Sequence, residues 1–277
     1  MPSNLTVPLD DEKLRPISSS RPPVFAADQE SLFREVIELM TLNRIQFAIS
    51  GAFALHEHTG IWRDTKDLDF FMPAQEAARA LKVLENMGLA TEIADPVWLA
   101  KARRGDYYVD LITGMSNAVV RVDYCWIKRA NLSQVLGLPV RVLAPEELIA
   151  SKIFVAFRER FDGADICHVV FGTKGRLDWQ RLLHLIGEHW EMLLWCLVLY
   201  QYAYPAYGGY VPRAIWDELL QRFRVELEHP NQGIQFRGNL IDDKMFAIDV
   251  TEWGKRDILK EYRETAEMIE PKSEKAA

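Results

Sequence analysis

Residues 47–72, FAISGAFALHEHTGIWRDTKDLDFFM, decide the fold of this chain. The apolar residues at 45–49 predict a short buried strand, which Ser50-Gly51 ends at a turn into a helix over 52–59. Asp67-Leu68-Asp69 then runs directly into Phe70-Phe71-Met72, which predicts a second strand over 68–72. A strand, a turn of small residues, a helix and an acidic strand therefore follow one another within 26 residues.

The acidic pair of the second strand suits a divalent cation. Asp67 and Asp69 are two residues apart, so in an extended segment they project from the same face, roughly 6 to 7 Å apart along the strand. Mg²⁺ takes one or two carboxylates together with substrate phosphates as oxygen ligands. The simpler alternative is a surface pair that caps the loop or binds Arg63 and Lys66. Asp69 lies inside an apolar run, however, and two half-buried like charges are costly without a cation. We therefore predict that both carboxylates bind metal.

The turn before this strand suits a phosphate. Ser50 and Gly51 are small, so backbone N–H groups and the start of the helix can approach a phosphate closely. The alternative is an ordinary strand-to-helix turn that requires a small residue. A phosphate cradle followed by a metal-binding pair indicates nucleotide chemistry.

This arrangement resembles the nucleotidyltransferase superfamily, in which a pair of small residues, a helix and Asp-x-Asp on the next strand form the signature. With Arg63 and Thr65 upstream of the acidic pair, it looks most like the AbiEii-type toxin nucleotidyltransferases over residues 30–170. The resemblance implies an α/β (α+β) fold, with a small mixed sheet flanked by helices. It also implies transfer of a nucleoside monophosphate from a nucleoside triphosphate to an acceptor. The turn departs from the family, since Ser-Gly stands where Gly-Gly or Gly-Ser is usual.

A third carboxylate belongs on a neighbouring strand in this family, where it binds metal or accepts the proton of the attacking hydroxyl. Asp110 and Asp123 both follow an apolar residue in predicted strands, and by pattern alone they differ little. The resemblance favours Asp110 as a metal ligand and catalytic residue. For either residue, the alternative is a carboxylate that caps a turn at the end of a strand.

Basic residues complete the predicted site. By resemblance, Lys152 and either Asp162 or Asp165 close the nucleotide site, and a lysine there can neutralise charge on the triphosphate. The alternative is an exposed helix face with ion pairs. Arg63 and Lys66 either hold phosphate oxygens or structure the loop before the acidic pair.

Composition limits the class of protein. The chain has 277 residues and a formal net charge of −7, which argues against a general nucleic-acid coat protein but permits a local basic groove. Its three cysteines are far apart, so neither a disulfide framework nor a structural zinc site is expected. The first thirty residues lack an apolar core, and the apolar stretch 192–200 is too short for a bilayer, which needs roughly 20 residues. These features predict a cytoplasmic protein without a membrane partner.

The order of predicted elements suggests four regions. Residues 1–26 are expected to be a flexible arm, 27–144 the nucleotidyltransferase core, 145–265 a helical domain and 266–277 a frayed tail. The predicted helices cover residues 27–43, 73–87, 146–158, 178–187, 189–204 and 212–228. The further predicted strands cover residues 89–93, 107–112, 119–126 and 139–143.

The leading hypothesis is a nucleotidyltransferase that depends on Mg²⁺ or Mn²⁺. Its acceptor is a hydroxyl of RNA, of a protein or of a small molecule such as a drug. By resemblance alone, it could be a toxin with a cognate antitoxin or act in phage defence. The alternative from another class is a non-catalytic module that binds a nucleotide or a partner and retains this fold.

Overall fold

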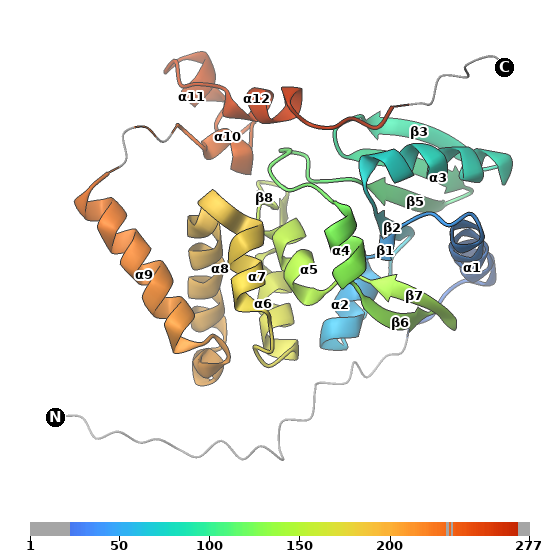
Figure 1. The fold of residues 1–277 in the computed structure, drawn as a ribbon, viewed down its shortest axis with the longest axis horizontal. Coiled ribbons are helices and arrows are strands. Elements are labelled where there is room, and N and C mark those ends of the chain that lie inside the picture. Colours follow the sequence, from blue (N-terminus) through green and yellow to red (C-terminus); the bar gives the residue numbers. More distant parts are fainter. Residues whose placement is uncertain (1–22, 231–232, 234, 271–277) are drawn as a thin grey trace.

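A seven-stranded mixed sheet organises the first half of the chain (Figure 1). The computed structural model describes residues 23–230, 233 and 235–270, so most of the predicted arm lies outside the described residues. The strands follow the order β3-β4-β5-β2-β1-β7-β6 across the sheet. Their bounds are β1 (Ala48–Ile49), β2 (Asp67–Phe71), β3 (Ala90–Asp95), β4 (Leu99–Arg104), β5 (Tyr107–Ile112), β6 (Asn131–Val135) and β7 (Leu138–Val142). The pairs β2–β5 and β1–β7 are parallel and the other neighbours are antiparallel, which confirms the predicted mixed sheet.

Alternation along β2 separates the core from the site. Leu68 and Phe70 are fully buried, and Phe70 packs edge-on against Phe47 at a ring-centre distance of 4.9 Å. The helices α1 (Ala27–Leu42) and α3 (Ala74–Asn86) lie side by side at the sheet (Figure 1). Because strand residues alternate between faces, Asp67 and Asp69 project to the face opposite Leu68 and Phe70. The helix α2 (Gly51–Thr59) begins on that second face, since Gly51 contacts Asp69.

A helical lobe packs beside the sheet and shares its hydrophobic core, which runs without interruption from α1 to α9. In this lobe, α2 contacts α5 and α6, and α5 contacts α6 and α7. The helices of the lobe are α4 (Tyr124–Arg129), α5 (Pro145–Lys152), α6 (Gly163–Gly172), α7 (Trp179–Ile186), α8 (Trp190–Ala203) and α9 (Arg213–Glu228). A two-stranded hairpin of β8 (Ala156–Phe157) and β9 (Arg160–Phe161) separates α5 from α6.

Two predicted elements were wrong. The strand expected over 119–126 is a loop that leads into α4, because the Asp123 carboxylate caps this helix by accepting N–H bonds from Cys125 (2.8 Å) and Trp126 (3.1 Å). The helix expected over 146–158 ends at Lys152, and the chain then turns into the β8–β9 hairpin. The sequence patterns also missed β4, β6 and α6.

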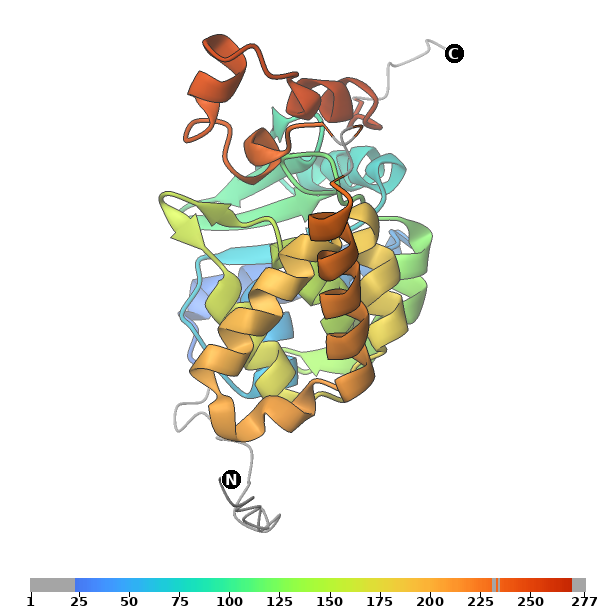
Figure 2. The ribbon, with the colours of Figure 1, turned by 90° about the vertical axis from the view of Figure 1, so that its left-hand side faces the viewer.

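The C-terminal segment returns over the sheet (Figure 2) through α10 (Gly238–Ile241), α11 (Ala247–Thr251) and α12 (Ile258–Glu264). Residues 266–270 differ from the predicted frayed tail. Ile269 is buried and donates its N–H to the Pro96 carbonyl at 2.7 Å, and Gln75 donates to Glu267. Burial of an apolar side chain on the sheet layer offsets the cost of ordering the chain here. Residues 271–277 lie outside the described part of the chain.

One helical stretch of the described residues, Trp179–Ala203, is apolar and long enough to cross a membrane by composition alone. It comprises α7 and α8, which are joined through Gly187 at a φ of +56°. Leu193, Leu197 and Tyr200 are fully buried in the shared core. The stretch therefore packs as two core helices, as the sequence predicted for residues 192–200.

Acid is expected to destabilise the lobe through His189, which is only 5% exposed and packs edge-on against Phe154 at a ring-centre distance of 5.2 Å. Burial and, secondarily, Arg237 lower the pKa of His189 to about 4, although Glu188 opposes the shift. The unfolded histidine has a pKa of roughly 6.5, so the unfolded state binds the proton first. Stability is then lost as the pH falls from roughly 6.5 toward 4, by an amount on the order of 3 kcal/mol.

Chemical denaturation at several pH values checks this expectation. The His189→Gln variant should show a smaller loss of unfolding free energy over that interval than wild type. Parallel curves for the two proteins would contradict the assignment, and the exposed His229→Gln variant is the control.

Candidate functional site

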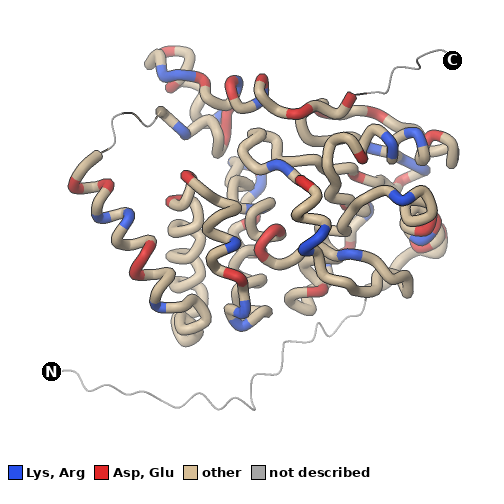
Figure 3. Tube along the Cα trace, in the orientation of Figure 1, with Lys and Arg blue, Asp and Glu red and all other residues tan. Residues whose placement is uncertain are grey.

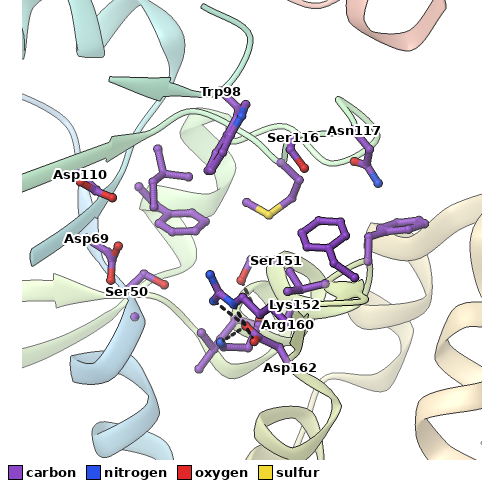
Figure 4. A pocket seen from close by; sticks show the side chains of 18 residues that line it. Ser50, Asp69, Trp98, Asp110, Ser116, Asn117, Ser151, Lys152, Arg160 and Asp162 are labelled. Atoms are coloured by element: carbon purple, nitrogen blue, oxygen red, sulfur yellow. Dashed lines mark hydrogen bonds and ion pairs between the residues drawn. The ribbon is translucent and has the colours of Figure 1, made fainter. Parts of the chain in front are cut away.

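Two carboxylates lie side by side on neighbouring strands in the middle of the sheet (Figure 4). Asp69 of β2 and Asp110 of β5 are direct partners in the parallel register, so their side chains leave the same face of the sheet. Both line a cavity of about 260 Å³. The sheet therefore brings together two of the predicted site residues that are 41 positions apart in the chain.

The Ser50-Gly51 turn forms the floor of this cavity beside Asp69. Ser50 is buried and donates its N–H to the Asp69 carbonyl oxygen at 3.0 Å. Gly51 has a φ of +58°, and a Cβ at this position would stand only 1.8 Å from Asp69 Oδ2. Glycine is therefore required twice, once for the backbone and once because the carboxylate occupies the place of a side chain. The start of α2 points its N–H groups into the same space, where they can bind a phosphate.

We expect Gly51→Ala to displace the Asp69 carboxylate. The change should lower the unfolding free energy by about 1 to 3 kcal/mol through strain and reduce nucleotide binding. A double-mutant cycle with Asp69→Ala checks the cause, because removing the carboxylate removes the clash. If the two changes are additive in denaturation, the contact between Gly51 and Asp69 is not responsible.

The acidic wall is electrostatically strained. Burial, then Asp110 and then Asp67 raise the pKa of Asp69 to about 7, while Lys152 and Arg160 act in the opposite direction. Burial also raises the pKa of Asp110, and Lys101 partly offsets that rise. Lys101 lies directly opposite Asp110 on β4 and donates to both carboxylate oxygens, at 2.8 and 3.0 Å. Asp69 is thus the carboxylate of this wall that most needs a cation.

The opposite wall of the cavity is basic and belongs to α5 and the β8–β9 hairpin (Figure 4). Lys152 Nζ lies 2.7 Å from Asp162 and 2.9 Å from Asp165. Arg160 forms a bidentate pair with Asp162, at 2.9 and 2.8 Å. These pairs hold two cations at the cavity wall while their charges still act on Asp69.

Other predicted residues lie beside the cavity or away from it. Arg63 is ion-paired with Asp165, which fits the predicted loop-structuring alternative for this residue. Lys66 is exposed and Asp67 is half-buried, and neither is among the cavity-lining residues in the described part of the chain. Asp123 caps α4 and is not among the cavity-lining residues of the described part of the chain, whereas Asp110 is.

The donor set suits a hard cation but does not form a complete cage. Within residues 23–230, 233 and 235–270, no group of three or more His, Cys, Asp or Glu side chains is arranged to hold a metal ion. Among the described residues, the structure therefore does not assemble the predicted metal-binding trio of Asp67, Asp69 and Asp110, and Asp110 is instead paired with Lys101. Mg²⁺ needs only one or two carboxylates when substrate phosphates complete its shell, so Asp67 and Asp69 fit it.

Sequence reasoning missed three residues of the site: Trp98, Lys101 and Arg160. A signal for Lys101 was present, because the Gly105-Asp106 turn of a hairpin pairs position 101 with 110. Arg160 could not be found, since its place depends on a hairpin that the helical pattern at 146–158 concealed. Trp98 lies just before β4, itself missed, and enters the cavity from that side (Figure 4).

Comparison with known proteins gives one family and several structures. The family model described as "Nucleotidyl transferase of unknown function (DUF2204)" matches residues 29–189. No curated protein sequence matches the chain. The antibiotic-resistance factor ANT(2'')-Ia is similar in structure at 15% identity and a TM-score of 0.38, covering 66% of this chain and 96% of its own.

Two further structures are similar at the same level. The lincosamide antibiotic adenylyltransferase LnuA, with lincomycin bound, is 14% identical with a TM-score of 0.38 and covers 52% of this chain and 96% of its own. An antigenic nucleotidyltransferase-like protein from Paracoccidioides brasiliensis is 17% identical with a TM-score of 0.39, covering 68% of this chain and 94% of its own.

Proposed function

Because this chain belongs to the family of nucleotidyl transferases of unknown function, we propose that it moves a nucleoside monophosphate from a nucleoside triphosphate to an acceptor hydroxyl. The observation that carries the proposal is the cavity itself. Asp69 and Asp110 meet in register on one wall, Lys152 and Arg160 stand on the other, and the Ser50-Gly51 turn lies at the floor.

The triphosphate binds between the turn and the basic wall. The Gly51 N–H, the Ser50 hydroxyl and the first turn of α2 donate to its β- and γ-phosphate oxygens, whereas the Ser50 N–H stays bonded to the Asp69 carbonyl. Lys152 and Arg160 neutralise the negative charge that moves onto the leaving pyrophosphate. Asp162 and Asp165 keep Lys152 in place, since each carboxylate is itself buried and accepts from that ammonium group.

Asp67 and Asp69 are the residues that would hold a divalent cation, Mg²⁺ or Mn²⁺, with the substrate supplying further oxygen ligands. When bound, such a cation polarises the α-phosphate and stabilises the charge on the attacking and leaving oxygens. The raised pKa of Asp69 supports this assignment. Burial and the neighbouring carboxylates Asp110 and Asp67 disfavour the charged form of Asp69, and a bound cation would stabilise that form.

Asp110 receives the proton of the acceptor hydroxyl. Its two oxygens accept from Lys101, which fixes the carboxylate toward the cavity, and each oxygen keeps a further lone pair. The hydroxyl oxygen attacks the α-phosphorus, the bond from that phosphorus to the bridging oxygen of the β-phosphate breaks, and pyrophosphate leaves. The products are the nucleotidylated acceptor, pyrophosphate and a proton on Asp110.

The direct test supplies wild type with Mg²⁺ and each of the four α-labelled triphosphates, alongside total RNA, cell lysate and pooled small alcohols. Transfer of label by wild type, and none by Asp69→Asn, is the expected result. Equal transfer by the two proteins would contradict the assigned roles. Mg²⁺-dependent nucleotide binding without transfer to any acceptor would instead support the non-catalytic binding module.

The narrower AbiEii-type resemblance leads to a second proposal, a growth-inhibiting toxin of the cytoplasm with a cognate antitoxin. It is supported by Arg63 and Thr65 upstream of the acidic pair. Induced expression in a bacterial host tests it: growth arrest by wild type and none by Asp69→Asn is expected. Normal growth with active, soluble enzyme would overturn the toxin role and leave the chemistry untouched.

A further inference from the structure

We infer that the acceptor is a small, flat, largely uncharged molecule that carries a hydroxyl, an inference that rests on the proposed function. The cavity has two unlike halves. The charged half, at the Ser50-Gly51 turn, Lys152 and Arg160, is assigned above to the triphosphate. The other half is lined by apolar and aromatic side chains: Phe71, Trp98, Ile112, Met115, Phe154 and Phe157.

The apolar half of the cavity adjoins Asp110, the residue proposed to accept the proton of the acceptor hydroxyl. Two residues after Asp110, Ile112 ends β5, and the following loop carries Met115, Ser116 and Asn117 along the cavity (Figure 4). An acceptor hydroxyl that donates its proton to Asp110 therefore has the rest of its molecule against this lining. Apolar walls with a few convergent polar groups are typical of sites for small organic molecules.

Trp98 presents a fixed aromatic surface to this half. Its indole N–H donates to Asp95 Oδ2 at 3.1 Å, and its carbonyl accepts from the Thr113 N–H at 2.9 Å. Asp95 is in turn held by Arg263 of α12, whose Nη2 donates to both carboxylate oxygens at 2.9 Å. A ring whose polar edge is anchored offers its face for stacking at little entropic cost, which favours a flat partner.

Charge disfavours a polycationic acceptor. Among the described residues that line the cavity, the acidic ones are Asp69, Asp110 and Asp162. Asp110 is paired with Lys101, and Asp162 with Lys152 and Arg160. Only Asp69 is without a basic partner, and its charge is assigned to the metal. The side chains named above for the apolar half carry no charge, so an acceptor with several ammonium groups would find no unpaired carboxylate there to bind.

Two hydrogen bonds tie segments that line the cavity to residues 240–242 of the C-terminal part of the chain. The side-chain amide of Asn117 donates to the Leu240 carbonyl at 2.9 Å. The backbone N–H of Arg158, in the β8–β9 hairpin, donates to the buried Asp242 carboxylate at 2.9 Å. Residues 240–242 thus bind two of the segments that line the cavity. Figure 3 also shows Lys and Arg interspersed with Asp and Glu along the trace in that view, and the formal net charge of −7 argues against a general affinity for RNA, which calls for a basic patch.

Calorimetry on the full-length protein tests the inference in two stages. Each α,β-methylene triphosphate is first titrated in Mg²⁺, and the complex with the one that binds best is then titrated with 2-naphthol, kanamycin or a short single-stranded RNA. We expect wild type to bind 2-naphthol, and Trp98→Ala to weaken that binding by about tenfold or more while the nucleotide Kd stays within about twofold. Trp98→Phe keeps a flat ring and should stay within about threefold of wild type, and the exposed Trp253→Ala should change neither affinity.

Each other outcome has a distinct meaning. Nucleotide binding without 2-naphthol binding, or transfer of label to kanamycin or RNA in the activity assay, overturns the inference but leaves the proposed function. Loss of nucleotide affinity in Trp98→Ala, with 2-naphthol unaffected, shows that the apolar half holds the nucleobase and also overturns it. Absence of nucleotide binding by wild type defeats the proposed function itself.

Discussion

Asp69→Asn should abolish nucleotidyl transfer and, in the metal-free protein, raise stability. The activity is expected to fall by about a thousandfold or more, because the variant loses a metal-binding charge that acts in the transition state. Stability should rise although activity falls. Burial, then Asp110 and then Asp67 destabilise the charged Asp69 carboxylate in the folded protein, and the asparagine side chain carries no charge. Asparagine has nearly the same shape, so it keeps the packing against Gly51 while removing the charge.

The pH dependence of that gain follows from linkage. Asp69 has a folded pKa of about 7, above the unfolded value of roughly 3.9, so the folded state holds the proton longer. Wild-type stability is therefore lost as the pH rises from roughly 4 through 7, whereas the asparagine variant lacks this loss. The advantage of Asp69→Asn should be absent near pH 4 and reach about 2 to 4 kcal/mol above pH 7 in EDTA.

Chemical denaturation with and without Mg²⁺ measures both effects. Mg²⁺ should stabilise wild type at pH 8 and leave Asp69→Asn unchanged, since binding to the folded state raises its stability. The exposed Asp106→Asn variant, in the turn between β4 and β5, is the matched control and should behave as wild type in both assays. An Asp69→Asn protein that is less stable than wild type at pH 8 in EDTA would refute the electrostatic account.

Lys152→Met should damage both folding and catalysis. The lysine side chain is 11% exposed, and its ammonium group holds Asp162 and Asp165, whose side chains are 10% and 7% exposed. Removing one partner from buried ion pairs leaves carboxylates short of a cation, so we expect a loss of about 3 to 5 kcal/mol in unfolding free energy. Arg160 and Arg63 still bind these carboxylates, which places the loss toward the lower value.

Activity should fall by about 100-fold or more, since in the proposed mechanism the Lys152 ammonium group also neutralises charge on the triphosphate. Denaturation curves and single-turnover transfer rates, measured below the temperature at which the variant unfolds, separate the two effects. Lys152→Arg retains the charge and should recover most of the stability, and the exposed Lys82→Met variant of α3 should match wild type. Full activity in folded Lys152→Met would remove the lysine from the proposed mechanism.

The pattern over residues 47–72 determined the centre of the fold. Short-range rules suffice there, because a Gly at a turn and alternation along β2 depend on neighbours in the sequence. Those rules predicted the strand that carries Asp67 and Asp69 and the turn that contacts it. They also predicted the strand that carries Asp110, because an apolar alternating run identifies β5, but the choice of Asp110 over Asp123 came from the family resemblance.

The predictions of secondary structure were wrong where one local sequence pattern is compatible with two different structures. Val119–Trp126 has the apolar alternation of a strand, but Asp123 caps a helix, and that hydrogen bond is visible only once the backbone turns. Residues 153–158 continue the helical pattern of α5, but the chain folds into a hairpin because Asp162 and Asp242 accept from its members. In both regions, contacts from distant residues outweigh local propensity.

The sequence by itself determined which residue types form the candidate site: two small residues at a turn, acids on strands and a lysine on a helix. Only the tertiary structure decided how they share charge. Parallel pairing of β2 with β5 places Asp69 beside Asp110. Antiparallel pairing of β5 with β4 places Lys101 opposite Asp110, where the two form an ion pair. The β8–β9 hairpin places Arg160 on the opposite wall of the cavity. The physical reason is that electrostatic interactions depend on distance and burial in space, and neither can be read from separations along the chain.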